Sequence, residues 1–552
     1  MYGILSAYLL ITTISRVSSI SDLPHIIIIL ADDLGWNDVS FHGSNQFLTP
    51  NIDALAYSGL ILKDYYTQPI CTPSRAALLS GKHPIHNGMQ HDVIYAPEPW
   101  GLPLTEKLMP EFLQDLGYTT RAVGKWHLGF FKADYTPSRR GFDSHYGAWL
   151  GHQDHYTHMA FEKHPGFDFH RELNVSWEAK GKYAADIFTE EAEHIIQEHD
   201  VESPLFLYLA HISPHAPLEA PQDLINQFRY IPDRKRRTFA AMVTKLDESV
   251  GRVTQALRDK NMLNNSIILF LSDNGGATNG FNGNVASNWP LRGGKDTLWE
   301  GGVRVVGAVW SPLLSGTPRV HRGLINSEDW LPTLLSAAEG LKDEDVNKFD
   351  GFSQWDALNK RGTAPYDTLL HNIDDNRTIR AIRKGPWKIV IGRTYGGQYD
   401  GHYGKLSGKV AYDPEVIRDS MVGRAIQDTS SPLPSSQIML DLRAQATVTC
   451  TPSSDVAPHV IQVREINSIE QGFRSQRKDT SECKPHIAPC LFNIVEDPCE
   501  YHNLAAERPD VVNDLIELLK SYHPVPINNK PEDPRSFPSN WNNTWTTWMD
   551  FV

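Results

Sequence analysis

Hydrophobic residues form short continuous runs along this chain, separated by stretches in which apolar residues recur at helical spacing. Such runs without polar residues are typical of strands buried on both faces. Three of them are residues 25–30, 204–210 and 266–271. Residues 238–259 have the spacing of a long amphipathic helix, and 51–58 and 104–116 that of shorter helices. Strands alternating with helices predict an α/β fold whose large sheet is doubly wound, mostly parallel and flanked by helices.

The pattern of hydrophobic and polar residues changes near residue 367 and indicates a separate, smaller group of strands and helices. Residues 378–383 and 387–391 have the alternation of a β-hairpin. Residues 491–495 indicate a further strand and 509–523 an amphipathic helix. The stretch between, 396–484, is polar and has no convincing period. We therefore expect a small antiparallel sheet with one helix at the C-terminal end.

Residues 1–21 combine a short apolar run with Ser and Thr, as in a secretory signal peptide, although the absence of an early Lys or Arg leaves an uncleaved anchor as the alternative. We find no later apolar run long enough to span a bilayer, and we expect no stable membrane insertion. Since 552 residues exceed one ordinary core, we expect a large domain at 22–366. A smaller sheet-and-helix domain with an irregular, cysteine-containing insertion would occupy 367–552.

Polar side chains that can bind ions or move protons follow the predicted strands. Because the carboxyl ends of parallel strands meet at one edge of a sheet, we expect these side chains to gather there. They are Asp32, Asp33, Lys125, His127, His215, Asp273 and Asn274. The oxygen donors among them suit a hard cation, Ca²⁺ before Mg²⁺. The alternative is that the carboxylates cap nearby helices.

Residues 71–75, Cys-Thr-Pro-Ser-Arg, place a thiol and a guanidinium at the start of an apolar helix. Pro73 suits the first position of that helix, so Cys71 should lie just ahead of a helix N-terminus, where free amides favour negative charge. A nucleophile or an anion would be stabilised there. A buried structural thiol is the alternative.

The run C-T-P-S-R-A-A-L-L-S-G from Cys71 resembles the signature of the type I sulfatases, and G-Y-T-T-R-A-V-G-K-W-H at 117–127 resembles a second signature of that family. The resemblance extends from Pro24 to the C-terminal helix. It implies a sulfatase catalytic domain of the alkaline-phosphatase-like fold at 22–366. It also implies that a formylglycine-generating enzyme converts Cys71 to formylglycine. One Ca²⁺ would be bound by Asp32, Asp33, residue 71, Asp273 and Asn274.

The same resemblance implies a hydrolysis of sulfate esters in which one hydroxyl of a formylglycine hydrate at residue 71 attacks sulfur and the other helps to release sulfate. Asp273 would assist the attacking hydroxyl, and His127 would take the proton of the second. His215 would donate a proton to the leaving oxygen. The residues that would hold the hydrate or bind sulfate oxygens are Arg75, Lys125 and Lys295.

Residues 32–39 and 289–304 look most like the branch of the family that contains arylsulfatases B, I and J. This implies aryl sulfates and sulfated sugars, such as the N-acetylgalactosamine 4-sulfate of glycosaminoglycans, as substrates. Two other functions stay open at this point. One is hydrolysis of phosphate or phosphonate esters on the same scaffold, and the other is binding of sulfated glycans without cleavage.

Sequons and cysteines indicate the secretory route, with the lysosome or the extracellular space as the destination. The candidate glycosylation sites are Asn174, Asn264, Asn376 and Asn542. Apart from Cys71, the cysteines are Cys450, Cys483, Cys490 and Cys499, which we expect to form disulfides in one of three pairings. A zinc site is the disfavoured alternative, because no C-x-x-C pair is present.

The formal charge of −14 gives no reason to expect a nucleic-acid partner. Protonation of the 23 histidines in an acidic compartment would reverse the sign of the charge. Acid would therefore suit an anionic substrate, such as a sulfated small molecule or a sulfated glycan, better than neutral pH does.

Overall fold

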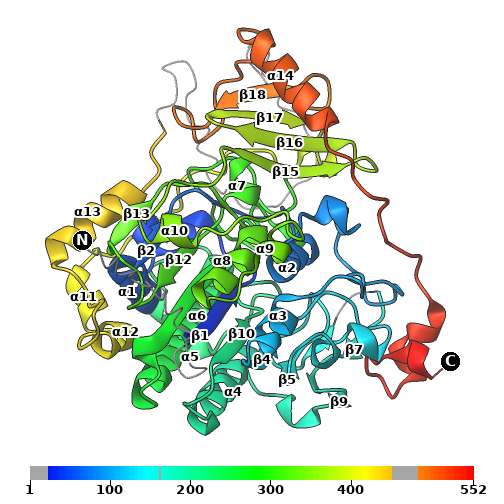
Figure 1. The fold of residues 1–552 in the computed structure, drawn as a ribbon, viewed down its shortest axis with the longest axis vertical. Helices are drawn as coiled ribbons and strands as arrows, with labels where there is room; N and C mark the ends of the chain where they lie inside the picture. The colour runs from blue at the N-terminus through cyan, green and yellow to red at the C-terminus, as the bar shows by residue number, and fades with distance from the viewer. Residues whose placement is uncertain (1–22, 161–162, 451–482, 552) are drawn as a thin grey trace, which may run out of the picture.

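The computed structural model describes residues 23–160, 163–450 and 483–551, so the predicted signal peptide lies outside the described residues. A ten-stranded sheet forms the centre, in the order β13-β2-β12-β11-β1-β10-β4-β5-β8-β9 (Figure 1). Its middle strands β11, β1, β10, β4 and β5 run parallel, whereas β12 pairs antiparallel with β11. The predicted mostly parallel α/β fold is confirmed.

Three strands of this sheet, β1, β10 and β11, match the predicted apolar runs closely. The strands of the sheet are β1 His25–Ala31, β2 Leu60–Leu62, β4 Thr119–Gly124, β5 Ser144–Gly147, β8 His170–Arg171, β9 Asn174–Val175, β10 Leu205–Ala210, β11 Ser266–Ser272, β12 Gly307–Trp310 and β13 Arg319–His321. Within β1, Ile27 and Ile29 enter one hydrophobic core, and Ile26 and Ile28 enter the core on the opposite face. A strand buried on both faces cannot carry polar residues, which is why the run is continuous.

Helices cover both faces of the sheet. One face packs against α1 (Pro50–Ser58), α4 (Ala184–Glu198) and α6 (Arg234–Asp259). The other packs against α2 (Cys71–Ser80), α3 (Met109–Asp115) and α8 (Trp330–Ala337). The predicted helix at 104–116 is shortened to α3, since Pro110 has no N–H and belongs in a first helical turn.

The register of the parallel strands brings their carboxyl ends to one edge of the large sheet. Ala31 of β1 lies opposite Ser272 of β11, and Ala210 of β10 lies opposite Gly124 of β4. Gly124 has a positive φ of 102°, and a Cβ there would meet Ala210 O at 1.9 Å. This close approach requires glycine and fixes the direction of the chain that enters Lys125.

A separate four-stranded antiparallel sheet lies at one end of the molecule, at the top of Figure 1. Its strands are β15 Thr368–Asp374, β16 Ile379–Lys384, β17 Trp387–Ile391 and β18 Cys490–Asn493. Helix α14 (Pro509–Lys520) packs against this sheet through Leu515 and Leu519. The chain then returns along the large domain, where Val525 N donates to Ile85 O at 2.7 Å and Asp533 N donates to Pro97 O at 2.8 Å.

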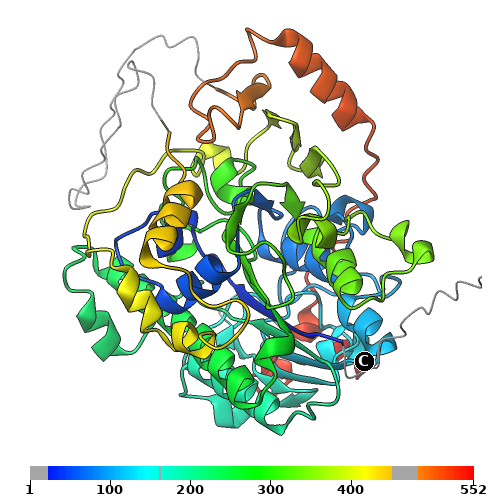
Figure 2. The same cartoon turned by 60° about the vertical axis from the view of Figure 1, so that its left-hand side comes forward.

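We expected the stretch 396–484 to be irregular, but its described part up to residue 450 contains α11 Pro414–Arg418, α12 Met421–Ala425 and α13 Ser436–Ala446. Ile417, Val422 and Met439 belong to the core beneath α1 and α6. Figure 2 shows these helices, in yellow, over the large sheet and away from α14. Helices of one or two turns give little periodic signal and form through tertiary packing. The division at residue 366 stays a prediction.

Shorter elements complete the described chain. They are β3 Tyr65–Tyr66, β6 Met159–Ala160, β7 Gly166–Phe167, β14 Ile325–Asn326, α5 Gln222–Gln227, α7 Glu300–Val303, α9 Asp343–Val346 and α10 Trp355–Leu358. None of the described helices has the length and apolar character needed to cross a membrane.

The cysteines adopt one of the three pairings that the sequence left open. Cys450 is bonded to Cys499 and Cys483 to Cys490, whereas Cys71 is free and buried. All four asparagines of the predicted glycosylation sites are exposed, as modification requires. Glycosylation itself stays a prediction.

Candidate functional site

Cys71 is the first residue of α2, with Ile70 as its N-cap. Pro73 is therefore the third helical residue and not the first, and Cys71 belongs to the helix instead of preceding it. The position still suits proline, because the first amides of a helix need no intrahelical partner. Cys71 Sγ lies 3.7 Å from Asp32 Oδ1, and Lys295 Nζ lies 3.2 Å from the sulfur. Burial raises the pKa of the thiol to about 12.

Three carboxylates and one amide surround Cys71, and all are buried. Asp32 and Asp33 follow β1, whereas Asp273 and Asn274 follow β11. Asp33 N donates to Asp273 Oδ1 at 3.2 Å, and Asn274 Nδ2 donates to Asp33 Oδ1 at 2.7 Å. Burial and the neighbouring Asp32 charge raise the pKa of Asp33 and raise that of Asp273 to about 6. Close packing of these acids requires compensating positive charge.

Three basic side chains provide that compensation. Arg75 donates from Nε and Nη2 to Asp273 Oδ2 at 3.1 and 2.9 Å. Lys125 Nζ lies 2.6 Å from Asp32 Oδ2, and Lys295 Nζ lies 2.6 Å from Asp33 Oδ1. Although burial opposes it, the nearby cations, Lys125 foremost, hold the pKa of Asp32 well below its usual range. The three acids and three bases are thus balanced in formal charge.

The same cluster has the donors of a metal site. Single ligand atoms of Asp32, Asp33, Cys71 and His215 lie within 4.8 Å of one another. Asn274 Oδ1 is buried and has no hydrogen-bond partner among the described residues. Carboxylate and amide oxygens prefer a hard cation. The oxygen donors here therefore suit a hard cation, whereas the predicted ligand Asp273 is not part of the group within 4.8 Å and is held by Arg75.

Two predicted catalytic histidines reach the cluster. His127 Nε2 lies 3.2 Å from Ile94 O, whereas its Nδ1 is without a partner in the described chain. His215 Nε2 lies 3.6 Å from Asp33 Oδ2. Burial lowers the pKa of both imidazoles, assisted by Lys125 and Arg75 at His127 and by Lys295 and Lys125 at His215. By contrast, His211 contacts Ser249 Oγ at 2.9 Å under the sheet and does not enter the site.

His152 is a site residue that the sequence reasoning missed. Its ring centroid lies 5.2 Å from that of His215, and burial with Lys295 and Lys125 lowers its pKa to about 4. The preceding Gly151 packs on His127, since a Cβ there would meet His127 Cε1 at 2.0 Å. This loop follows β5, a four-residue strand too short to be predicted. A search of its carboxyl end would have found His152.

Every predicted catalytic residue therefore lies in one cluster at the carboxyl edge of the large sheet. It contains Cys71, Arg75, Lys125, His127, His215, Asp273 and Lys295. Residues as far apart in sequence as Asp32 and Lys295 meet in this cluster. They do so only because the parallel sheet places the ends of its strands side by side. A buried anion-binding helix start, three basic side chains, an oxygen-rich cation site and two imidazoles together suit the hydrolysis of an anionic ester.

Comparison with known proteins agrees with this geometry. The family model described as Sulfatase matches residues 24–341. Mouse arylsulfatase J is 37% identical over 535 residues, which cover 95% of this chain and 80% of the relative. Mouse N-acetylgalactosamine-6-sulfatase is 33% identical over 384 residues, or 67% of this chain and 72% of the relative.

A solved structure, Ps i-CgsB in complex with k-i-k-neocarrahexaose, superposes with a TM-score of 0.62 at 28% identity. It covers 76% of this chain and 98% of that one. Residues 24–341, which the family model matches, contain the α2 helix start, both carboxylate pairs and the basic residues that meet at Cys71. The chain belongs to the sulfatase family and is a sulfuric ester hydrolase.

Proposed function

We propose that the chain hydrolyses sulfate esters of sugars, with Ca²⁺ and with a formylglycine formed from Cys71. The observation that carries the proposal is the convergence of Lys295, Lys125, Arg75 and the oxygen-rich cluster on residue 71. Substrates would be aryl sulfates and sulfated sugars, such as N-acetylgalactosamine 4-sulfate in glycosaminoglycans. The name of the relative N-acetylgalactosamine-6-sulfatase and the oligosaccharide in the superposed structure support a sugar substrate.

Formylglycine at residue 71 would supply, as its hydrate, one hydroxyl that acts as the nucleophile and a second hydroxyl whose deprotonation allows sulfate to leave. Ca²⁺ would act there as a template and Lewis acid, bound by Asp32, Asp33, Asp273, Asn274 and residue 71. The orphaned Asn274 Oδ1 supports this assignment. A formylglycine-generating enzyme is the partner that this maturation requires.

The chain's own residues would then bind the anion and move protons. Lys125 and Lys295 would bind sulfate oxygens, since both ammonium groups already face the cluster around residue 71. Arg75 would hold Asp273 in place through its two bonds to Asp273 Oδ2, and its charge would help to hold the hydrate at residue 71. Asp273 would accept the proton of the attacking hydroxyl.

His127 and His215 would divide the remaining proton transfers. His127 Nδ1, buried and without a partner in the described chain, would accept the proton of the second hydroxyl. His215 would protonate the leaving oxygen. Its surroundings favour the neutral imidazole, so this step needs the negative charge of bound sulfate or an acidic medium. The two locations reached by the secretory route differ in this respect. The lysosome supplies an acidic medium, whereas in the extracellular space the negative charge of bound sulfate would have to suffice.

The proposal is tested on protein secreted from cells that contain the modifying enzyme. Mass spectrometry of the peptide containing residue 71 should detect formylglycine, and Cys71→Ala should abolish turnover of an aryl sulfate. An aryl phosphate assayed beside it should be a much poorer substrate. Unmodified cysteine in protein that nevertheless turns over sulfate, or a preference for phosphate, would contradict the proposal.

A further inference from the structure

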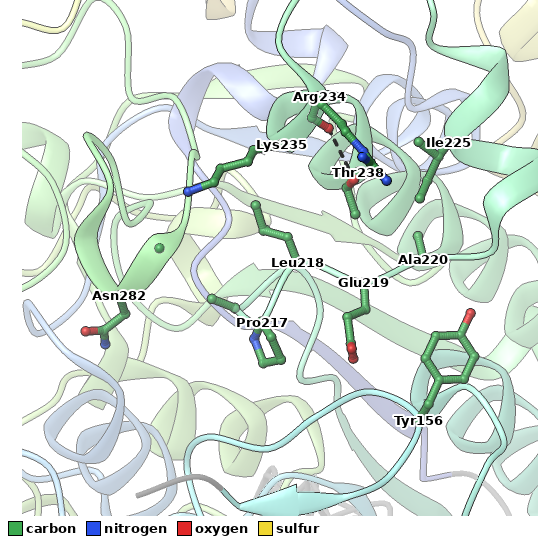
Figure 3. A pocket seen from close by; sticks show the side chains of 12 residues that line it. Tyr156, Pro217, Leu218, Glu219, Ala220, Ile225, Arg234, Lys235, Thr238 and Asn282 are labelled. Carbon is green, nitrogen blue, oxygen red and sulfur yellow. Dashed lines mark hydrogen bonds between the residues drawn. The ribbon is translucent and has the colours of Figure 1, made fainter. Parts of the chain in front are cut away.

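A cavity of 660 Å³ (Figure 3) lies next to the loop that carries His215. Its walls include Tyr156 from the loop after β5, Pro217 and Glu219 from the loop after β10, and Asn282 from the loop after β11. Ala216 also lines the cavity and directly follows His215. Loops from three strand ends thus form both the catalytic cluster and this cavity. The cavity is therefore built from the same loops as the catalytic cluster.

The first turn of α6 forms another wall of the cavity and is unusually basic. Residues 234–237 are Arg-Lys-Arg-Arg. Arg236 is buried and donates to Gln46 Oε1 at 2.7 Å, and Arg237 donates to Pro232 O at 3.0 Å. Arg234 and Lys235 instead line the cavity, are exposed, and form no ion pair with any acid in the described ranges. Two of the four cations are thus used by the fold and two are available to a ligand.

Little negative charge opposes these two cations within the cavity. Glu219 is the only acid that lines it, and Figure 3 shows it on the side opposite Arg234 and Lys235. Glu219 accepts a hydrogen bond from His155 N at 2.9 Å. Burial and the adjacent Asp154 raise the pKa of Glu219 to about 7, so in acid it is neutral. The cavity is therefore positive under acidic conditions.

The rest of the lining suits a sugar ring. Tyr156, Pro217 and Leu218 offer flat or apolar surface, and Thr238 and Asn282 offer polar groups at the edges. A volume of 660 Å³ is within the range of small-molecule sites. A carbohydrate with one negative group would match both the surface and the charge.

We propose that this cavity binds the sugar that neighbours the sulfated one, and that Arg234 and Lys235 recognise an anionic group on that neighbour, either a carboxylate or a second sulfate. The preferred substrate is then a polyanionic glycan and not an isolated sulfated sugar. This inference rests on the proposed function, because the sulfate ester must occupy the centre at residue 71.

The test compares the double variant Arg234→Gln/Lys235→Gln with the wild type on four substrates. These are an aryl sulfate without a second sugar and three sulfated disaccharides, whose second sugar is neutral, carries a carboxylate or carries another sulfate. Loss of charge-assisted hydrogen bonds should lower kcat/KM about 10-fold to 100-fold for the two anionic disaccharides. Turnover of the aryl sulfate and the neutral disaccharide should stay unchanged.

The matched control is Lys180→Gln/Lys182→Gln, which removes the same charge from exposed positions outside the cavity and should leave all four rates unchanged. A selective loss on one anionic disaccharide identifies carboxylate or sulfate as the recognised group. An equal loss on all four substrates, or the same loss in the control, overturns the proposal.

Failure of the proposed function would give a different result: the wild type would hydrolyse none of the four substrates. Binding of the carboxylate disaccharide without its ester sulfate, followed by ligand-observed NMR, then tests the cavity alone. Weaker binding by the double variant than by the control supports the cavity assignment. Absence of binding by the wild type overturns it.

Discussion

A buried lysine joins the small sheet to the large domain, and its two acidic partners make stability depend on pH. Lys388 Nζ on β17 lies 2.8 Å from Glu300 Oε1 and 2.9 Å from Glu500 Oε1, and all three side chains are fully buried. Glu500 Oε2 also accepts a hydrogen bond from Glu300 N at 2.8 Å. Arg304 Nη1 also lies 3.5 Å from Glu300 Oε2, so Glu300 receives more compensating charge than Glu500, and Glu500 is the acid that keeps a proton to higher pH.

The substitution Glu500→Gln removes that titration. Burial and the Glu300 charge, opposed by Lys388, raise the pKa of Glu500 from 4.5 to about 7. A raised pKa means that the folded state holds the proton more tightly, so this stabilisation is complete below the unfolded pKa and is lost as pH rises through the folded one. Between pH 5 and pH 8 the loss amounts to about 2–3 kcal/mol.

Thermal unfolding at both pH values measures the effect. For a cooperative unit of this size, the loss corresponds to a Tm change of about 2 °C. Glu500→Gln should therefore be more stable than the wild type at pH 8 by about that amount and equal to it at pH 5. The comparison cancels the many buried histidines, which titrate equally in both proteins.

The exposed Glu507→Gln is the control and should follow the wild type at both pH values. If Glu500→Gln has the same difference in Tm between pH 5 and pH 8 as the wild type, the carboxylate pair does not share a proton and the reasoning fails. A lower Tm for the variant at both pH values would show instead that the carboxylate is needed as a charged partner of Lys388.

Three further predictions concern the site and the disulfides. His215→Ala should lower kcat about 10²-fold to 10⁴-fold for a sulfated sugar but far less for an activated aryl sulfate, whose leaving group needs no proton; equal losses would exclude His215 as the acid. Removal of bound cations with a chelator should abolish turnover, and Ca²⁺ should restore it, whereas full activity after exhaustive chelation would contradict the assigned ion. Replacing Cys450 and Cys499 by Ser should destabilise the protein by about 4 kcal/mol, and replacing Cys483 and Cys490 by about 2.5 kcal/mol, because the first bond closes the longer loop. Unfolding of the two variants in urea under oxidising conditions decides whether this order of stability holds.

Much of the catalytic cluster could be predicted because its residues lie next to strongly patterned strands. The apolar runs that form β1, β10 and β11 are local features, and polar residues directly after them must lie at the carboxyl edge of a parallel sheet. His152 was missed because the strand before it lacks such a pattern. It follows β5, whose four residues are too few to give a recognisable pattern.

The basic run at 234–237 shows where sequence reasoning stops. The four residues have similar chemistry, and periodicity alone does not say which of them find partners. Only the packing of α6 turns Arg236 into the core and leaves Arg234 and Lys235 at the cavity. The helices at 414–446 were missed for a related reason, since short helices depend on the surface they cover.

Local patterns along the chain are enough to predict the α/β class, the central strands and the residue types that gather at their ends, because burial on both faces of a sheet demands uninterrupted apolar runs. Which of those side chains meet, which cysteines pair and which cations remain available depends on the folded arrangement. Contacts such as that between Lys388 and Glu500 join residues 112 positions apart. Their geometry follows from strand register and domain packing, which no local pattern encodes.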